Sequence, residues 1–236
     1  MDRQELKLLA EKLIIRLGRW QGENQRLWLT ERRVDDYTVY TACLSSLPLA
    51  LSFDEFRQCL PTREQARIAR FHRSEDRQRS LVGLYLFEHA VRNAGQTWQW
   101  ESFVRSATGR PMLQPTGEYD CNVSHSGDFV VCAIGPRSVG IDIEQVREID
   151  VTEFRRFFPP DIYQHILTAD MSVSEFFRWW TRIESVLKAD GRGLCDDLTA
   201  LRFCDCAREI LLDNRRWRCC DLDIAPGYVC CLAMAY

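Results

Sequence analysis

The chain has 236 residues, of which 46% are hydrophobic and 28% charged, and its formal net charge is −3. This composition is typical of a globular protein with one substantial core, and the slight acidic balance excludes a general nucleic-acid binder. No apolar run approaches the roughly 20 residues that span a bilayer, and the charged start is unlike a secretory signal, so we expect a cytoplasmic protein with reduced cysteines.

The first part of the chain predicts a helical extension followed by an α+β unit. Residues 37–47 are rich in β-formers and predict a strand. Residues 62–93 predict two helices, the first with Thr62 as N-cap and Gln65 as its capping-box partner. An amphipathic helix within residues 1–33 is predicted by the helical spacing of Leu6, Leu9, Leu13, Ile14 and Leu17.

The second part predicts more strands and two more helices. Residues 98–106, 129–134 and 139–146 predict strands, and residues 108–117 predict a loop. Residues 154–166 and 174–190 predict helices, the second with a capping box of Ser172 and Glu175 and an end at Gly191. Residues 198–236 predict a strand meander. The order of all these elements suggests two α+β halves that meet near residues 135–140.

Two carboxylates follow the predicted strand 139–146 at alternate positions. Gly140, Asp142 and Glu144 share one face, because side chains alternate across a strand. The two acids would lie about 7 Å apart, beside a glycine that leaves room for a ligand. The alternative interpretation is an exposed strand face with ordinary charges.

A third carboxylate and a lysine follow on the helix 174–190. Trp180, Glu184 and Lys188 are spaced four residues apart and lie along one side of that helix. Glu184 and Lys188 could instead form a surface ion pair worth a few tenths of a kcal/mol. Three oxygen ligands beside a cation suit Mg²⁺ and a phosphate-bearing substrate.

Four segments together resemble the 4′-phosphopantetheinyl transferase family, in its large two-lobed, surfactin-type class. They are residues 109–113 (GRPML), 122–126 (NVSHS), 139–144 (VGIDIE) and 180–188 (WTRIESVLK), in the family's order, and the similarity spans residues 36–236. The resemblance implies an α+β fold of two pseudo-symmetric lobes, each an antiparallel sheet packed on a long helix. The expected units are an extension (1–33), a first lobe (34–137) and a second lobe (138–236), in a monomer.

The resemblance also implies an activity. Such enzymes transfer the 4′-phosphopantetheine group of coenzyme A to a serine of an apo acyl or peptidyl carrier protein and release adenosine 3′,5′-bisphosphate. It implies Mg²⁺ on Asp142, Glu144 and Glu184, with Glu184 also a possible base and Lys188 stabilising the leaving group. The implied coenzyme A contacts are Arg67, Ser80, Arg110, Ser124, His125 and Lys188.

One departure from the family pattern concerns Ile183, where the family usually has lysine before the helix glutamate. By helical geometry Ile183 points about 100° away from Glu184, toward the apolar stripe. Either Arg182 or another base replaces the missing cation, or activity is lowered. Two alternative functions therefore stay open: a coenzyme A or carrier-binding module without transfer, and a Mg²⁺-dependent nucleotide pyrophosphate hydrolase.

Overall fold

The computed structural model describes residues 29–47, 53–114, 118–193, 198, 201–204 and 208–236. Most of the predicted helical extension, including its leucine repeat, lies outside these residues. The prediction that the helical extension reaches residue 33 is wrong. Leu29–Val34 forms strand β1, which pairs with β2, Tyr37–Cys43. The four central residues of β1 are polar or charged and exposed, which suits its edge position in a sheet.

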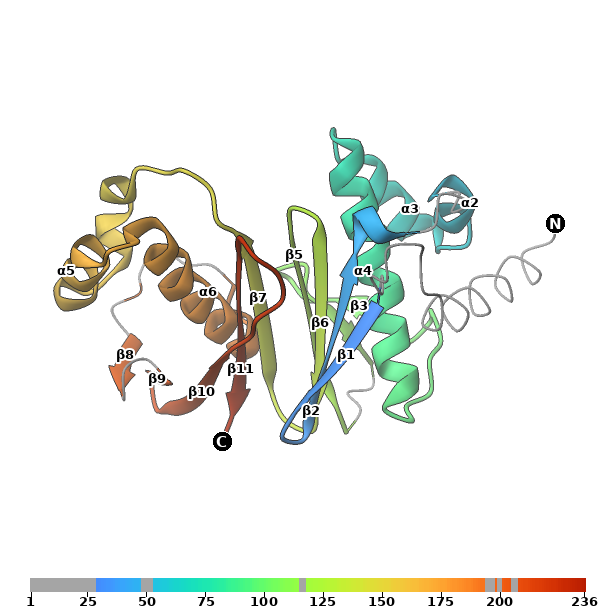
Figure 1. The fold of residues 1–236 in the computed structure, drawn as a ribbon. Coiled ribbons are helices and arrows are strands. Elements are labelled where there is room, and N and C mark those ends of the chain that lie inside the picture. Colours follow the sequence, from blue (N-terminus) through green and yellow to red (C-terminus); the bar gives the residue numbers. More distant parts are fainter. Residues whose placement is uncertain (1–28, 48–52, 115–117, 194–197, 199–200, 205–207) are drawn as a thin grey trace.

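Two antiparallel sheets lie side by side, each packed against one long helix (Figure 1). The first has the strand order β1-β2-β6-β5, with β5 at Asp120–Ser126 and β6 at Phe129–Gly135, and packs on α4, Ser74–Asn93. The second has the order β7-β11-β10-β9-β8 and packs on α6, Ser172–Asp190. This architecture confirms the expected α+β fold. The strands of the second sheet are β7 (Val139–Gln145), β8 (Leu201–Cys204), β9 (Glu209–Leu212), β10 (Arg215–Asp221) and β11 (Tyr228–Ala235).

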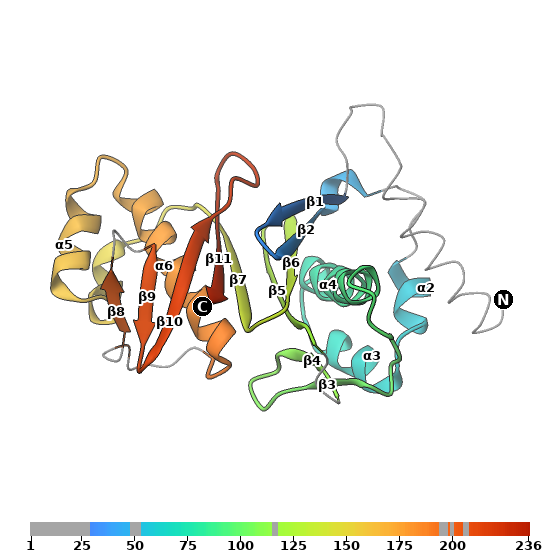
Figure 2. The same cartoon turned by 90° about the horizontal axis from the view of Figure 1, so that it is seen from below.

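Shorter elements surround the two long helices, and Figure 2 shows α3 and the β3–β4 hairpin beside α4. Among the described residues, no helix is both long and apolar enough to cross a membrane. The shorter elements are η1 (Leu44–Ser46), α2 (Phe53–Gln58), α3 (Thr62–Ala69), β3 (Phe103–Arg105), β4 (Pro111–Leu113), η2 (Val151–Phe157) and α5 (Pro160–Thr168).

The predicted capping boxes are wrong. Thr62 and Ser172 are the first residues of their helices, and neither N-cap residue, Pro61 or Met171, makes a side-chain capping bond. The predicted end of α6 is confirmed, because Gly191 adopts the left-handed conformation at φ 88°. This conformation is readily available to glycine, and it lets the chain leave the helix in one residue.

Three apolar layers hold the molecule together. One lies between the first sheet and α4, and another between the second sheet and α6. The third lies between the two sheets, where Val39 and Val131 of the first meet Ile141 and Leu232 of the second. Alternation along β7 therefore sends its apolar residues to the other lobe and its acids toward α6.

The two sheets are joined by side chains of β5 that bind the backbone of β7. The edge strands β5 and β7 have no backbone ladder between them. Instead, the carboxylate of Asp120, the amide oxygen of Asn122 and the hydroxyls of Ser124 and Ser126 accept hydrogen bonds from β7. The four donors are the backbone N–H groups of Val139, Ile141, Ile143 and Gln145, at 2.8, 2.9, 3.4 and 3.0 Å. We call these four β5 side chains the polar rungs.

Strand β5 itself was not predicted from the sequence, which indicated only the strand at residues 129–134. The rung residues are polar and two of them, Asp120 and Asn122, are poor β-formers. They are tolerated here because their side chains accept hydrogen bonds from backbone N–H groups of β7, which would otherwise lack a partner in the protein.

Candidate functional site

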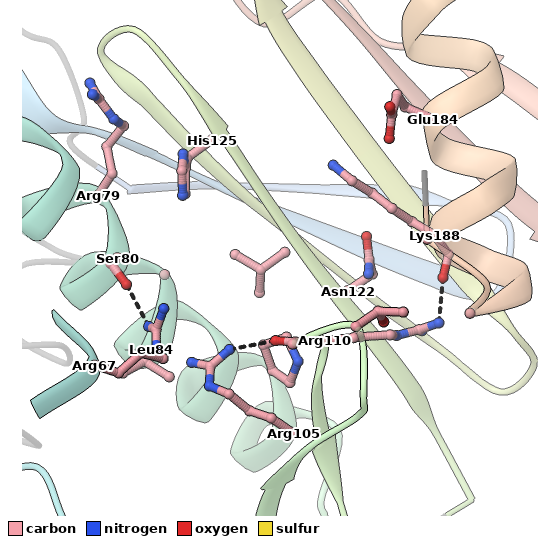
Figure 3. A pocket seen from close by; sticks show the side chains of 17 residues that line it. Arg67, Arg79, Ser80, Leu84, Arg105, Arg110, Asn122, His125, Glu184 and Lys188 are labelled. Atoms are coloured by element: carbon pink, nitrogen blue, oxygen red, sulfur yellow. Dashed lines mark hydrogen bonds between the residues drawn. The ribbon is translucent and has the colours of Figure 1, made fainter. Parts of the chain in front are cut away.

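A cavity of about 320 Å³ lies between the lobes, and its walls carry side chains from both (Figure 3). Arginines of α3, α4 and β3 form one wall, and the α6 side chains of Glu184 and Lys188 stand across from them. Of the predicted site residues, the cavity is lined by Arg67, Ser80, Arg110, His125, Glu184 and Lys188. Three others, Ser124, Asp142 and Glu144, do not line it. Ser124 and Asp142 are hydrogen-bonded to Lys188, which does, and Glu144 accepts a hydrogen bond from Ser126.

A buried carboxylate organises the arginine wall. Glu64 is 3% exposed and accepts hydrogen bonds from Arg67 Nε at 3.0 Å and Arg105 Nη2 at 2.9 Å. Burial alone would raise the pKa of Glu64, but the adjacent Arg105 and Arg67 outweigh it and hold that pKa below its ordinary value. Glu64 therefore stays ionised and fixes two guanidinium groups, while Arg67 also donates to Ser80 Oγ at 2.5 Å.

This arrangement was only partly predictable. Arg67 and Ser80 were predicted, whereas Arg105 and its clamp Glu64 were missed, because no local spacing links residue 64 to residue 105. Arg79, one of the six arginines in residues 63–79, also lines the cavity. It donates to the Gly127 carbonyl at 2.7 Å and to Asp76 at 2.6 Å.

On the opposite wall, Lys188 joins the acid strand to the cavity. Its ammonium lies 2.5 Å from Asp142 Oδ1 and 3.0 Å from Ser124 Oγ. Burial alone would lower the pKa of Lys188, but the charge and hydrogen bond of Asp142, together with the charges of Glu184 and Glu144, outweigh it and raise that pKa above its usual value. Asp142 is only 3% exposed and the Lys188 side chain 27%, so this ion pair is largely buried. The ion pair of Lys188 is therefore with Asp142, and not the surface pair with Glu184 considered above.

The other two acids have no such direct cation. Burial raises the pKa of Glu184 to about 7, and the charges of Asp142 and Glu144 add to this effect against the attraction of Lys188. Burial and the charge of Asp142 also raise the pKa of Glu144, which accepts a hydrogen bond from Ser126 at 2.8 Å. The charge of Asp142 therefore reaches both other carboxylates, and Lys188 attracts both of them.

The expectation that Gly140 makes room for a ligand is wrong. A β-carbon built on Gly140 would lie 1.9 Å from the Ser185 carbonyl oxygen and 2.5 Å from the Ala189 nitrogen, both on α6. The glycine therefore lets the helix backbone approach the strand. That close approach brings Lys188 of α6 to Asp142 of β7.

Arg110 reaches the cavity wall but its terminal nitrogens are directed at protein groups. Nη1 donates to the Lys188 carbonyl at 2.5 Å, and Nη2 to Asp120 Oδ2 at 2.6 Å and to the Val139 carbonyl at 3.0 Å. The side chain thus ties the β4 loop to β5, β7 and the last turn of α6.

His125 projects into the cavity near Arg79 (Figure 3). His125 is exposed to the cavity, but desolvation by the surrounding protein, together with the positive charges of Arg79 and Lys188, lowers the pKa of the imidazole. A neutral imidazole here can donate and accept one hydrogen bond each.

Ile183 lies in the core of the second lobe, as its helical position predicted. Its side chain is 0% exposed and packs in the apolar layer between the second sheet and α6. Arg182 does not line the cavity but pairs with Asp221, at 2.6 Å. The cations that do line it beside Lys188 come from the first lobe.

Replacing Ile183 with lysine should therefore destabilise the protein. An ammonium buried without a partner costs at least about 3 kcal/mol of unfolding free energy. Urea unfolding of Ile183→Lys measures this loss, and Ile183→Val, expected to lose about 1 kcal/mol, is the control for volume. An unchanged free energy of unfolding for Ile183→Lys would show that the lysine escapes the core.

Comparison with known proteins agrees with this geometry. Residues 47–137 match the family model described as "4′-phosphopantetheinyl transferase, N-terminal". Residues 138–233 match the one described as "4′-phosphopantetheinyl transferase superfamily". The two matches are contiguous and together span most of the chain, with their junction between the two sheets.

Individual relatives point the same way. The chain is 32% identical over 140 residues to 4′-phosphopantetheinyl transferase psf-1 of Bacillus pumilus, covering 58% of this chain and 60% of that protein. It is 30% identical over 146 residues to 4′-phosphopantetheinyl transferase Sfp of Bacillus subtilis (strain 168), covering 60% and 64%. The matched regions thus span less than two thirds of these relatives. With both family models matched in succession, the chain belongs to the 4′-phosphopantetheinyl transferase superfamily.

Proposed function

We propose that this protein transfers the 4′-phosphopantetheine group of coenzyme A to a serine of an apo acyl or peptidyl carrier protein. One observation carries the proposal: the interlobe cavity has fixed arginines on one wall and the Lys188–Asp142 pair with Glu184 on the other. A ligand that carries several phosphates and reacts at one of them needs such a distribution of charge. The relatives' names support the same activity.

The chemistry would be a phosphoryl transfer at the pyrophosphate of coenzyme A. The carrier serine oxygen forms a bond to the phosphorus on the pantetheine side, and the bond from that phosphorus to the bridging oxygen breaks. Adenosine 3′,5′-bisphosphate leaves with that oxygen. Positioning and charge neutralisation dominate the catalysis of such transfers, which suits the cationic walls.

Glu184 and Lys188 would manage the proton and the charge. Glu184, with a pKa of about 7, can accept the serine proton near neutral pH. Lys188 stays charged beside Asp142 and would stabilise the negative charge that develops on the departing bisphosphate. His125, Arg67, Arg105 and Ser80 would hold the nucleotide end in the cavity.

We further propose that Asp142, Glu144 and Glu184 hold a Mg²⁺ ion. Within the described residues, no three acidic, histidine or cysteine side chains already form a metal cluster, and Lys188 occupies one oxygen of Asp142. The donor set nevertheless fits: Asp142 Oδ2 is buried without a described hydrogen-bond partner, and the charge of Asp142 helps to raise the pKa of both Glu184 and Glu144. Bound there, Mg²⁺ would act as a Lewis acid for the transferred group.

We also propose a cytoplasmic monomer with its lobe boundary at residues 137–138, on the turn between β6 and β7. The nine cysteines among the described residues are all free thiols, which suits a reducing compartment. One chain supplies both walls of the cavity, so catalysis needs no second copy.

Mass spectrometry of carrier proteins tests the proposed activity and separates it from the alternatives. The protein is incubated with Mg²⁺, coenzyme A and a panel of apo carriers. A carrier that gains one phosphopantetheine confirms transfer. Cleavage of coenzyme A without carrier modification would indicate a hydrolase, and coenzyme A binding without turnover would indicate a binding module.

Loosening the arginine wall should weaken substrate binding more than turnover. Glu64→Gln removes the charge that holds Arg67 and Arg105, so we expect the KM for coenzyme A to rise about tenfold while kcat changes less than about twofold. Steady-state kinetics at saturating carrier measure both constants.

The control for this variant is Glu88→Gln, which removes the charge of another buried helix glutamate, paired with Arg92 at 2.9 Å and away from the cavity. It should leave the KM unchanged. Equal KM values for Glu64→Gln and the parent protein would contradict the clamp.

A further inference from the structure

Two polar rungs do more than join the lobes. Ser126 Oγ accepts a hydrogen bond from the Gln145 N–H at 3.0 Å and donates one to Glu144 Oε2 at 2.8 Å. Ser124 Oγ accepts from the Ile143 N–H at 3.4 Å and donates to Asp142 Oδ1 at 2.9 Å. In each case one β5 hydroxyl lies between a β7 backbone donor and the acid one residue earlier on β7.

The direction of these hydrogen bonds is dictated by chemistry. A backbone N–H can only donate, and so can the Lys188 ammonium that lies 3.0 Å from Ser124 Oγ. Both groups therefore use lone pairs of the serine oxygen. The single hydroxyl proton is left for the carboxylate, so one oxygen of each acid is held by the first lobe.

The second oxygen of Asp142 is then set in place without a described partner of its own. Ser124 is 6% exposed and neither serine lines the cavity, and both hydroxyls donate to the acids of β7 instead. The coenzyme A contact that the family resemblance implies for Ser124 stays a prediction.

We propose that Ser124 and Ser126 are positioning residues that orient Asp142 and Glu144 to bind a divalent cation. This inference rests on the metal role proposed above. The first lobe would thereby set up the acids of the second, and removing one hydroxyl would release one carboxylate oxygen. Loss of a hydrogen bond to a metal-binding group typically weakens metal affinity about 10- to 100-fold.

Metal binding can be measured without any transfer reaction. We would titrate the full chain with Mn²⁺, in the absence of coenzyme A and carrier, and count free ion by electron paramagnetic resonance. Ser126→Ala should raise the dissociation constant about tenfold. Ser126→Thr, which keeps the hydroxyl, should stay within about twofold of the parent protein. Thr41→Val removes a buried hydroxyl elsewhere in the first sheet and should leave the Mn²⁺ dissociation constant unchanged.

The outcomes separate this inference from the proposed function. If the parent protein binds Mn²⁺ and Asp142→Asn does not, while Ser126→Ala binds as well as the parent, the positioning role is overturned and the metal role stands. If the parent does not bind Mn²⁺, both fail. If Ser126→Ala lowers the melting temperature but leaves the Mn²⁺ affinity unchanged, Ser126 only stabilises the contact between the lobes, and the inference is also overturned. Should Ser124→Ala fail to fold, Ser126 at the end of β5 still decides the question.

Discussion

Replacing Asp142 with asparagine should lower kcat/KM for phosphopantetheine transfer about a thousandfold. The substitution keeps the shape of the side chain but removes the charge that holds the Lys188 ammonium at 2.5 Å. It also removes a proposed Mg²⁺ ligand, so two sources of charge stabilisation are lost together. Carrier modification followed by mass spectrometry over several orders of magnitude in time measures the loss.

The matched control is Asp128→Asn, on the turn between β5 and β6. Asp128 accepts a hydrogen bond from the Ser45 N–H at 2.8 Å and does not line the interlobe cavity. It should keep transfer within about threefold of the parent value, because the carboxylate of Asp128 is hydrogen-bonded to Cys43 and Ser45 and to none of the groups assigned to the reaction. An Asp142→Asn variant that also stayed within tenfold would refute both roles assigned to Asp142.

Glu184→Gln should have the second large effect: it should lower the activity and raise the stability of the folded chain. If Glu184 accepts the serine proton, its removal costs about 10²- to 10⁴-fold in kcat. In the parent protein kcat/KM should rise with pH through about 7, because only ionised Glu184 acts as a base. Glu184→Gln should lose this acidic limb. If the acidic limb of the pH profile is still present in Glu184→Gln, another group accepts the serine proton.

The stability effect follows from the raised pKa. Glu184 titrates near 7 in the folded chain and near its ordinary value of 4.5 in the unfolded one. Between these values the unfolded chain ionises first, so folded stability falls as pH rises toward 7. Glu184→Gln should therefore melt at a higher temperature than the parent at pH 8, without added metal. At pH 4 the two should melt alike, and a difference of equal size at both pH values would contradict the linkage.

Local patterns predicted the parts of the site that lie within one element. The alternation of β7 placed Asp142 and Glu144 on one face, and the spacing of α6 placed Glu184 and Lys188 on one side. The same helical geometry put Ile183 in the apolar stripe, where it is buried. Such periodicities are properties of a single strand or helix, so they can be read before the chain is folded.

Partnerships between distant elements could not be read in this way. The clamp of Glu64 on Arg105 joins residues 41 apart, and Arg110 reaches across the lobe boundary to the Lys188 carbonyl. Gly140 was interpreted as space for a ligand because the sequence does not say which backbone approaches it. Strand β5 was missed for the same reason, since its residues are suited to a neighbour rather than to their own strand.

The polar rungs have a consequence for how this chain must assemble. β7 is the edge strand of its sheet, and side chains of β5 accept hydrogen bonds from its N–H groups at residues 139, 141, 143 and 145. Produced alone, residues 138–236 would expose an uncovered edge next to the apolar face of Ile141 and Leu232. Such an edge recruits other strands, so the isolated second lobe should aggregate unless the first lobe is supplied with it.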